Sequence, residues 1–451
     1  MAQISAFRAL RYDAKKVKDL ALVVAPPYDI VSPEEQDALY ARHPHNIVRL
    51  DFGKAQAGDN ESHNKYHRAA NLLRLWREQG VLKTDAKPAL YLATQTYTAP
   101  DGRKLSFSGV YAQLKLEDYR KGVVKPHEKT LSKPKADRLE LTKATLTNFS
   151  PIFFLYDDAK GAGARWMAAQ MKKKPAASFK TGSGELHKVW VVDAPAAVKS
   201  FTAALARQAV YIADGHHRYE TMLGFSKTAP RTVRAAAAHT LACLSPFQDP
   251  GLIILPTHRL VHGLRAFSPS RMLQSLAQDF DVSPQASLPE LERALAKARA
   301  AAAPKAKAKA GAASKGKAKA AREPHAFGLV LPGAHYLLTL KPAVDPLKAV
   351  KDKRSAAYKS LDVSLLQALV LEKVLGMTPE SIAAQENLIF EKDAARTAQA
   401  VAAGRAQAAF LLNPTRMDQL QAVSDAKDVM PQKSTYFQPK LITGAILRAM
   451  A

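Results

Sequence analysis

Apolar residues recur along this chain with two different periods. Short apolar or alternating runs are typical of buried strands, and they predict strands at Ala89–Ala93, Phe107–Leu114, Lys188–Val192, Ala209–Ala213, Gly251–Pro256, Ala326–Leu331, His335–Leu340 and Ala408–Leu412. Asp101-Gly102 between the first two runs is typical of a hairpin turn.

Amphipathic stretches between these runs predict helices. The clearest helix start is Ser32-Pro33-Glu34-Glu35, with serine at the cap and proline at the first helical position. Further helices are expected at Asn64–Gln79, Ala196–Arg207, Tyr219–Phe225, Ser364–Leu375 and Leu441–Met450. Because strands and helices alternate without a repeat period, we expect a mixed α/β (α+β) fold.

A chain of 451 residues is long enough for two or three domains. The pattern predicts an N-terminal α/β region at 1–160, a central region at 161–295 and a C-terminal α/β region at 324–451. Residues 296–323 between them are nearly all Ala, Lys, Gly, Ser and Pro, which predicts a disordered insertion.

The formal net charge is +26, and part of it is local. Nine lysines and arginines lie between Lys297 and Arg322 without an acidic residue, leaving +17 for the rest of the chain. This segment is either a solubilising linker or a polybasic arm that binds polyanions weakly and without sequence preference.

Several classes of protein are disfavoured by what the sequence lacks. It has no apolar run of the ~20 residues that a bilayer span needs, and its first residues do not resemble a signal peptide. Its one cysteine, Cys243, cannot form an internal disulfide, so we expect a soluble, cytoplasmic protein without a membrane partner. P-loop, Gly-x-Gly-x-x-Gly and Gly-x-Ser-x-Gly motifs are also absent.

The densest cluster of chemically capable side chains follows the strand expected at Ala209–Ala213. Asp214, Gly215, His216, His217 and Arg218 fall at a strand-to-helix turn, where unpaired N–H groups and the helix dipole favour an anion. A metal site at Asp214 is the alternative, but adjacent histidines on one helix point in different directions. A solvated polar first turn is the third interpretation.

Other candidate residues lie in loops. His127 and Glu128 offer an acid/base pair or metal ligands, or belong to a lysine-rich surface loop. The remaining candidates are placed after expected strands, where α/β proteins bind ligands and where ordinary turns also occur: His258, Arg259, Asn413, Lys433, Ser434 and Thr435.

Seven ordered motifs resemble the domain-of-unknown-function 1015 family, and the resemblance runs from about Phe7 to Gly444. They are Ala25–Asp29, Pro126–Glu128, Lys135–Leu139, Tyr211–Glu220, Leu255–Arg259, Phe410–Thr415 and Lys433–Lys440. The family implies no settled activity. Asp214–Arg218 is also similar to the Asp-Gly-His-His-Arg turn of free-serine kinases, which implies a ParB/sulfiredoxin-like element around residues 205–225.

The second resemblance implies a phosphotransfer enzyme that acts on a small hydroxyl metabolite such as serine, or on phosphoserine, with ATP or ADP and Mg²⁺. Gly215, Arg218 and Arg138 would hold phosphate, His216 or His217 would move a proton, and Asp214 would orient a histidine or bind Mg²⁺. Such kinases need a carboxylate to activate the hydroxyl, for which Glu128 is a candidate. A ParB-like nucleotide- or nucleic-acid-binding regulator and a metal-dependent hydrolase are the alternatives.

Overall fold

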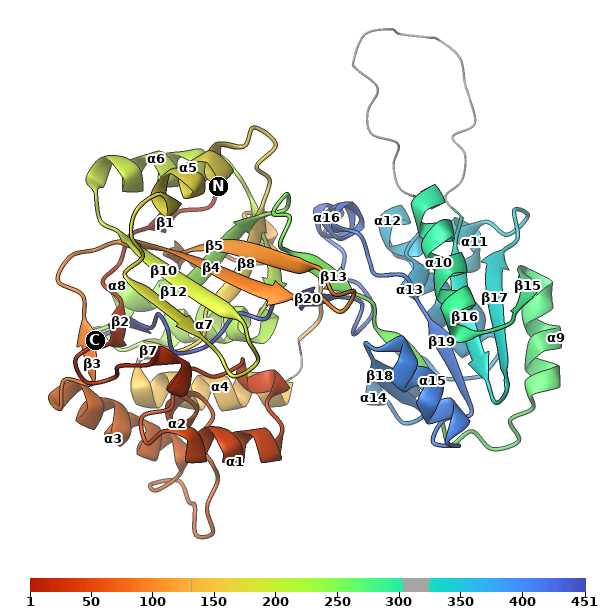
Figure 1. The fold of residues 1–451 in the computed structure, drawn as a ribbon, viewed down its shortest axis with the longest axis horizontal. Coiled ribbons are helices and arrows are strands. Elements are labelled where there is room, and N and C mark those ends of the chain that lie inside the picture. The colour runs from red at the N-terminus through yellow and green to blue at the C-terminus, as the bar shows by residue number, and fades with distance from the viewer. Residues whose placement is uncertain (131, 303–323) are drawn as a thin grey trace, which may run out of the picture. The chain divides into compact units, whose positions relative to one another are not determined.

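The computed structural model describes residues 1–130, 132–302 and 324–451, and Figure 1 draws the chain as a ribbon. The chain forms two compact units. Unit 1 comprises residues 1–253 and 437–451, and unit 2 comprises residues 254–436. Within the described ranges, no helix combines the length and apolar character that a bilayer crossing requires.

Unit 1 is built on a nine-stranded mixed sheet with the order β6-β11-β8-β12-β5-β4-β10-β9, and β1 pairs with β5. β11 runs parallel to β6 and β12 runs parallel to β8, whereas the other pairs are antiparallel. The strands are β1 (Ile4–Ser5), β4 (Leu90–Thr98), β5 (Lys104–Lys115), β6 (Val124–Lys125), β8 (Ile152–Tyr156), β9 (Ala177–Lys180), β10 (Leu186–Val192), β11 (Val210–Asp214) and β12 (His239–Pro246).

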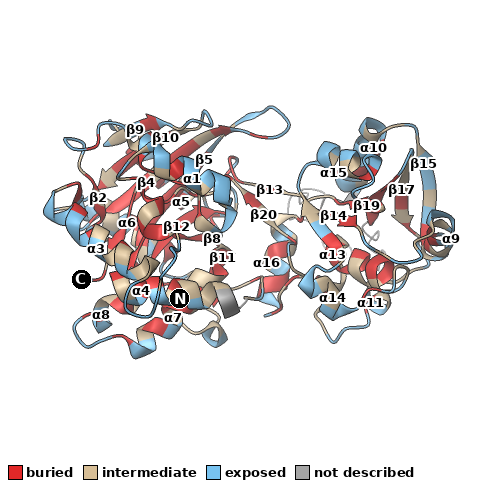
Figure 2. Cartoon of the chain, turned by 90° about the horizontal axis from the view of Figure 1, so that it is seen from below, coloured by how far each residue is buried: buried red, intermediate tan, exposed pale blue. Residues whose placement is uncertain are grey.

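Helices cover one face of this sheet, and a second group of helices, α1 to α3, packs around a separate core. Alternate sheet residues such as Phe154 and Leu244 pack against α5, α6, α7 and α8, and the buried residues follow the strands in Figure 2. The helices are α1 (Pro33–Arg42), α2 (Val48–Asp51), α3 (Lys65–Glu78), α4 (Ser132–Thr145), α5 (Ala162–Met171), α6 (Pro195–Leu205), α7 (His216–Thr228) and α8 (Arg234–Ala237). Short 3₁₀ turns are η1 (Leu20–Leu22), η2 (Tyr28–Ile30) and η3 (Tyr119–Lys121).

Local signals in the sequence place several of these elements correctly. Ser32 caps α1 by accepting a hydrogen bond from the Glu35 N–H, with Pro33 in the first turn. Asn64 caps α3 in the same way, and the expected hairpin at Asp101-Gly102 joins β4 to β5. The mixed α/β class is confirmed.

The helix expected at Leu441–Met450 is wrong, because this C-terminal tail is extended. Thr443 pairs with Ala25, Leu447 pairs with Leu10, and β21 (Arg448–Ala449) pairs with β7 (Thr147–Asn148). These partners lie far away in the sequence, so the apolar spacing of the tail could not reveal them. The buried Leu447 then joins the core formed by α1, α2, α3 and the pair β2 (Leu10–Tyr12) and β3 (Leu82–Thr84).

Unit 2 holds a six-stranded antiparallel sheet with the order β15-β17-β16-β19-β14-β18. Its strands are β14 (His258–Val261), β15 (Phe280–Gln285), β16 (Ala326–Leu331), β17 (Ala334–Leu340), β18 (Leu388–Glu391) and β19 (Ala408–Leu411). Its helices are α9 (Pro269–Asp279), α10 (Leu288–Ala302), α11 (Pro346–Ala349), α12 (Ala356–Lys359), α13 (Asp362–Leu365), η4 (Leu366–Glu372), α14 (Pro379–Ala384), α15 (Ala394–Ala402) and α16 (Met417–Asp425). β13 (Ile253–Leu255) and β20 (Tyr436–Gln438) form a further two-stranded pair. The chain divides into units within these two strands, between residues 253 and 254 and between residues 436 and 437.

The boundaries of the two compact units differ from the domain boundaries that the sequence predicts. Neither predicted boundary, at 160/161 or 295/296, coincides with the division at 253/254, and the last residues return to unit 1. The expected insertion at 296–323 begins too early, because α10 continues to Ala302 with alanine and lysine, which are good helix formers. Its remaining residues, 303–323, lie outside the described residues.

Candidate functional site

The Asp-Gly-His-His-Arg turn lies where the sequence predicts it, between β11 and α7 of unit 1. Gly215 caps α7 with φ of 97°, a left-handed conformation that favours glycine. A Cβ atom at Gly215 would also lie 3.0 Å from the Arg218 guanidinium. The glycine therefore lets Arg218 fold back over the helix N-terminus.

Asp214 holds two cations at this turn. Its carboxylate accepts a hydrogen bond from Lys440 Nζ at 2.9 Å and lies 3.6 Å from an Arg218 nitrogen. Burial raises the pKa of Asp214, but Lys440 and Arg218 outweigh this effect and keep the pKa well below its ordinary value. Arg218 also donates to the carbonyl of Pro151. The result is an ionised carboxylate that fixes an ammonium and a guanidinium side by side.

Asp29, in η2, supplies a second carboxylate to this charge cluster. It is exposed to solvent, yet enough protein surrounds it that lost hydration raises the pKa of its carboxyl, and repulsion from Asp214 adds to the rise. Arg218 and Lys440 oppose the shift. An accessible carboxyl with a raised pKa beside two cations is suited to accept a proton.

His127 and His216 form a buried, neutral pair beneath the turn. Their rings pack edge to face with centroids 4.6 Å apart, and His216 Nε2 accepts a hydrogen bond from the His127 backbone N–H. His127 Nδ1 lies 2.7 Å from the Ile212 carbonyl, which only a protonated Nδ1 can satisfy. Burial lowers the pKa of His127 to about 4 and lowers that of His216 well below its usual value. The two rings therefore fasten the loop at Pro126–Glu128 to β11 and to α7.

Glu128 and His217 lie at the edge of this pair. A neutral His216 that accepts at Nε2 carries its proton on Nδ1, which faces the Glu128 carboxylate at 3.9 Å. His217 is half-buried and follows His216 in the first turn of α7. The structure thus brings the His127 motif next to the Asp214 motif within unit 1, which the sequence alone does not reveal.

Arg138, expected to hold phosphate, is already paired with two carboxylates. Its guanidinium donates to Asp51 at 3.0 Å and to Asp137 at 2.6 Å, and it lies 3.9 Å from the centre of the Tyr28 ring. Its side chain is buried. Arg138 therefore ties α4 to α2 and supports Tyr28, the residue before Asp29.

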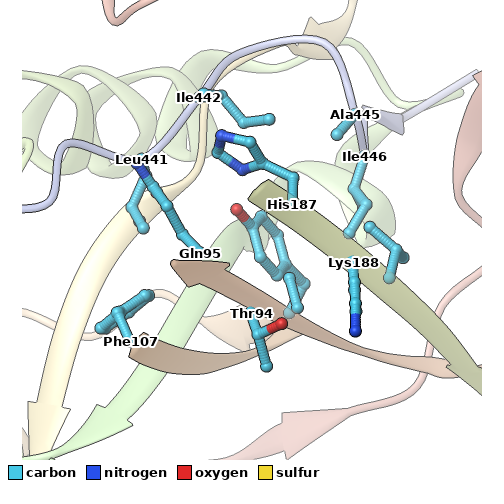
Figure 3. A pocket seen from close by; sticks show the side chains of 12 residues that line it. Thr94, Gln95, Phe107, His187, Lys188, Leu441, Ile442, Ala445 and Ile446 are labelled. Carbon is cyan, nitrogen blue, oxygen red and sulfur yellow. The ribbon is translucent and has the colours of Figure 1, made fainter. Parts of the chain in front are cut away.

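A small cavity separates the tail from the sheet and is shown in Figure 3. Leu441, Ile442 and Ile446 of the tail face Phe107 and His187 of the strands across about 20 Å³. That volume accommodates about one water molecule, so it is too small for a metabolite. The tail that carries Lys440 is consequently packed against the sheet by apolar contacts.

A metal site at Asp214 has little geometric support. Among residues 1–130, 132–302 and 324–451, no three His, Cys, Asp or Glu side chains are grouped to hold a metal ion. The carboxylate of Asp214 is engaged by Lys440 and Arg218.

The other expected site residues belong to unit 2, where each is described within its own unit. His258 Nδ1 accepts from the Leu412 N–H at 3.2 Å, and buried Arg259 donates to the carbonyls of Thr257, Gln432 and Lys433. Asn413 donates to the Leu295 carbonyl and Ser434 to the Pro431 carbonyl. Lys433 is exposed and Thr435 is half-buried. Their role in ligand binding stays a prediction.

Two members of the charge cluster, Asp29 and Lys440, were not singled out by sequence reasoning. Both lie within motifs that carry the family resemblance, but Lys440 was not distinguishable from Lys433 in the same segment. Only the return of the tail to unit 1 brings Lys440 to Asp214, 226 residues earlier in the chain.

The comparison with protein families decides the assignment of the chain. The family described as "Protein of unknown function (DUF1015)" matches residues 4–364. The chain belongs to the DUF1015 family. This result confirms the family resemblance, although the match ends at residue 364 and does not reach the motifs at Phe410–Thr415 and Lys433–Lys440. A comparison with curated proteins finds no match.

Solved structures that resemble this DUF1015 protein do so distantly. A free serine kinase in complex with AMP has a TM-score of 0.33 and 13% identity, covering 72% of this chain and 86% of that one. A conserved hypothetical protein from Pyrococcus furiosus has a TM-score of 0.34 and 13% identity, with coverages of 75% and 95%. C-terminally truncated SbnI from Staphylococcus aureus gives 0.32 and 9%, with coverages of 72% and 84%. Likeness at this level assigns no activity.

Proposed function

We propose that this protein transfers a phosphoryl group between a nucleoside phosphate, ATP or ADP, and a small hydroxyl metabolite such as serine. The observation that carries the proposal is the charge cluster of Asp29, Asp214, Arg218 and Lys440 at the N-terminus of α7. It combines donors for phosphate with an accessible carboxyl whose pKa is raised.

In this proposal, three kinds of donor would contact the phosphate. Arg218 and Lys440 supply a guanidinium and an ammonium, and the first-turn N–H groups of α7 add the positive end of the helix dipole. Asp214 fixes both cations before a ligand arrives, which lowers the reorganisation needed during transfer. His217, in the same turn, is the histidine that we assign to charge stabilisation. Neutral His127 and His216 position the loop.

Asp29 is the base in this proposal. Its carboxylate takes the hydroxyl proton of the acceptor, the acceptor oxygen bonds to the terminal phosphorus, and the bridging P–O bond breaks. The leaving group is ADP when ATP is the donor, or AMP when ADP is the donor. Mg²⁺ fits best as a companion of the nucleotide phosphates, because it is usually held by few protein carboxylates.

The proposal favours phosphotransfer over the alternatives for a geometric reason. A metal-dependent hydrolase needs a group of ligands that the described residues do not provide. A nucleic-acid-binding protein needs cations but no carboxyl with a raised pKa among them. A steep fall of DNA affinity with salt, without turnover of small molecules, would favour that second function.

The test is a direct search for transfer. Purified protein is incubated with Mg²⁺, with ATP or ADP, and with serine, and separately with phosphoserine and AMP or ADP. Phosphorus NMR then follows each phosphate. The proposal expects a new phosphate ester in at least one direction, and it expects Arg74→Ala on exposed α3 to transfer as the unchanged protein does. Hydrolysis of nucleotide to free phosphate alone, with no ester formed, would refute it.

A further inference from the structure

Unit 2 contains a cavity that the proposed reaction does not use. It has a volume of about 580 Å³, within the range of small-molecule sites, which is roughly 300 to 1,000 Å³. Its walls come from the start of β16, from α11 and α12, and from α16. α12 packs against α11, α13 and α16, and Figure 1 shows these helices within the same unit.

One wall carries a histidine whose orientation is fixed. His325 lines the cavity and is only 6% exposed, and its Nδ1 lies 2.8 Å from Asp362 Oδ1 at the start of α13. A neutral ring paired in this way carries its proton on Nδ1 and keeps a lone pair on Nε2. The Nδ1 edge is thus occupied by Asp362, and the Nε2 edge is the one that remains for a ligand; in the neutral ring that edge accepts a hydrogen bond.

A second acceptor lies on α12's C-terminal side. Ser360 also lines the cavity, and its hydroxyl donates to the Ala356 carbonyl at 2.9 Å. The hydroxyl hydrogen is thereby used, so the Ser360 oxygen is left to accept. The charged residues of the lining are two carboxylates, Asp345 and Asp418, and one guanidinium, Arg416. Arg416 donates to Asp418 at 3.0 Å.

Apart from Gln419, whose side-chain oxygen accepts from the Arg416 backbone N–H, the remaining lining is apolar. Pro346, Leu347, Ala356, Ala357 and Ala422 face the cavity, and Leu347 is 45% exposed although it is a large hydrophobic residue. Apolar walls with a few convergent acceptors are typical of a site for a small organic ligand.

We propose that this cavity of unit 2 binds a small, mainly apolar amine, whose ammonium donates to His325 and Ser360 while its apolar body packs on α11, α12 and α16. The acceptors set the polarity of the ligand, and the two carboxylates favour a cation over an anion. The site is independent of the charge cluster in unit 1, so either proposal can fail without the other.

A series of three probes of matched size tests the ligand class on the full chain. Calorimetry compares 2-phenylethylamine, 2-phenylethanol and phenylacetate, which share an aromatic ring and differ in the polar group. The amine is expected to bind most tightly, the alcohol more weakly, and phenylacetate at least tenfold more weakly than the amine. Equal binding of all three probes, tighter binding of phenylacetate, or saturable binding of none would overturn the proposal.

Two exposed alanines provide matched variants that locate the binding. Ala422→Trp on α16 fills the cavity, whereas Ala402→Trp at the end of α15 adds the same bulk elsewhere on unit 2. Affinity for 2-phenylethylamine should fall at least tenfold in the first variant and stay unchanged in the second. His325→Asn should also lower the affinity for 2-phenylethylamine. Its thermal unfolding midpoint should stay close to that of the unchanged protein, which would show that the variant is folded. Undiminished amine binding in Ala422→Trp would place it outside this cavity and contradict the proposal.

Discussion

Each unit has a histidine close to an arginine, but the surroundings of the two arginines differ. In unit 1, Arg218 lies beside Asp214, and Asp29 and Lys440 complete a cluster of four charges. In unit 2, Arg259 is 5% exposed, and within the described residues its guanidinium contacts carbonyl oxygens and the Phe390 ring but no carboxylate.

The histidines, in contrast, do similar work in both units. His216 accepts a backbone hydrogen bond from His127, and His258 accepts one from Leu412. Both are buried, and burial lowers the pKa of each. The comparison teaches that a histidine–arginine motif says little by itself, and that the accessible charges around the arginine distinguish a candidate site from a structural contact.

Of the matched substitutions at the two arginines, the larger effect is expected on turnover in unit 1. Arg218→Met removes a cation that stabilises developing phosphate charge, so kcat/KM should fall by about 10²- to 10³-fold. Arg74→Met on exposed α3 is the matched control and should leave kcat/KM unchanged. Steady-state kinetics with circular dichroism as a check of folding measures both. A folded Arg218→Met that retains full activity would remove Arg218 from the site.

The same substitution in unit 2 should act on stability. Burial lowers the pKa of Arg259 to about 9, and its loss would leave three carbonyls without their donor. Arg259→Met is therefore expected to lower the free energy of unfolding by about 3 kcal/mol, as measured in urea. A stability within about 0.5 kcal/mol of the parent would show that the carbonyls find other donors.

Acid should destabilise both units through their neutral histidines. The folded pKa of His127 and of His258 is about 4, below the unfolded value of roughly 6.5, so the unfolded chain binds protons first as the pH falls. Each histidine therefore lowers the free energy of unfolding by about 3 kcal/mol as the pH falls from ~6.5 to ~4. Below pH ~4 it causes no further loss, because it is protonated in both the folded and the unfolded chain.

Asparagine variants separate these two contributions. The side chain of His127→Asn can still donate to Ile212, and that of His258→Asn can still accept from Leu412, but neither titrates. Each variant should show a shallower loss of unfolding free energy between pH 6.5 and 4 than the parent. An unchanged pH slope in both would mean that other groups cause the acid transition.

Much of the fold follows from local signals, but the complete charge cluster does not. Caps at Ser32 and Asn64, the hairpin at Asp101-Gly102 and the turn at Gly215 act over a few residues, so the sequence predicts them. Asp29 and Lys440 reach Asp214 from opposite ends of the chain. The tail that carries Lys440 has the apolar spacing of a helix, yet its backbone pairs with Ala25 and Leu10. Pairings of this range leave no local pattern.

The smallest effect concerns Lys433, which the sequence predicts in a phosphate pocket. If Lys433, Ser434 and Thr435 hold a polyanion within unit 2, Lys433→Ala should weaken binding of inorganic phosphate to that loop only a few-fold, because an exposed cation contributes little. In unit 1, Lys440→Ala should raise the KM for nucleotide more strongly, since Lys440 is held in place by Asp214. Phosphate binding that is unchanged in Lys433→Ala would remove the loop from the candidate residues.

The most direct measurement of the central claim is the single-turnover rate of Asp29→Asn beside that of Asp101→Asn, an exposed hairpin carboxylate. The amide keeps the size of Asp29 but cannot take a proton, so phosphoryl transfer should slow by about 10²- to 10⁴-fold while nucleotide affinity is retained. In the parent, the rate should rise with pH through the raised pKa of Asp29. An Asp29→Asn protein that transfers phosphate as fast as Asp101→Asn would contradict the account.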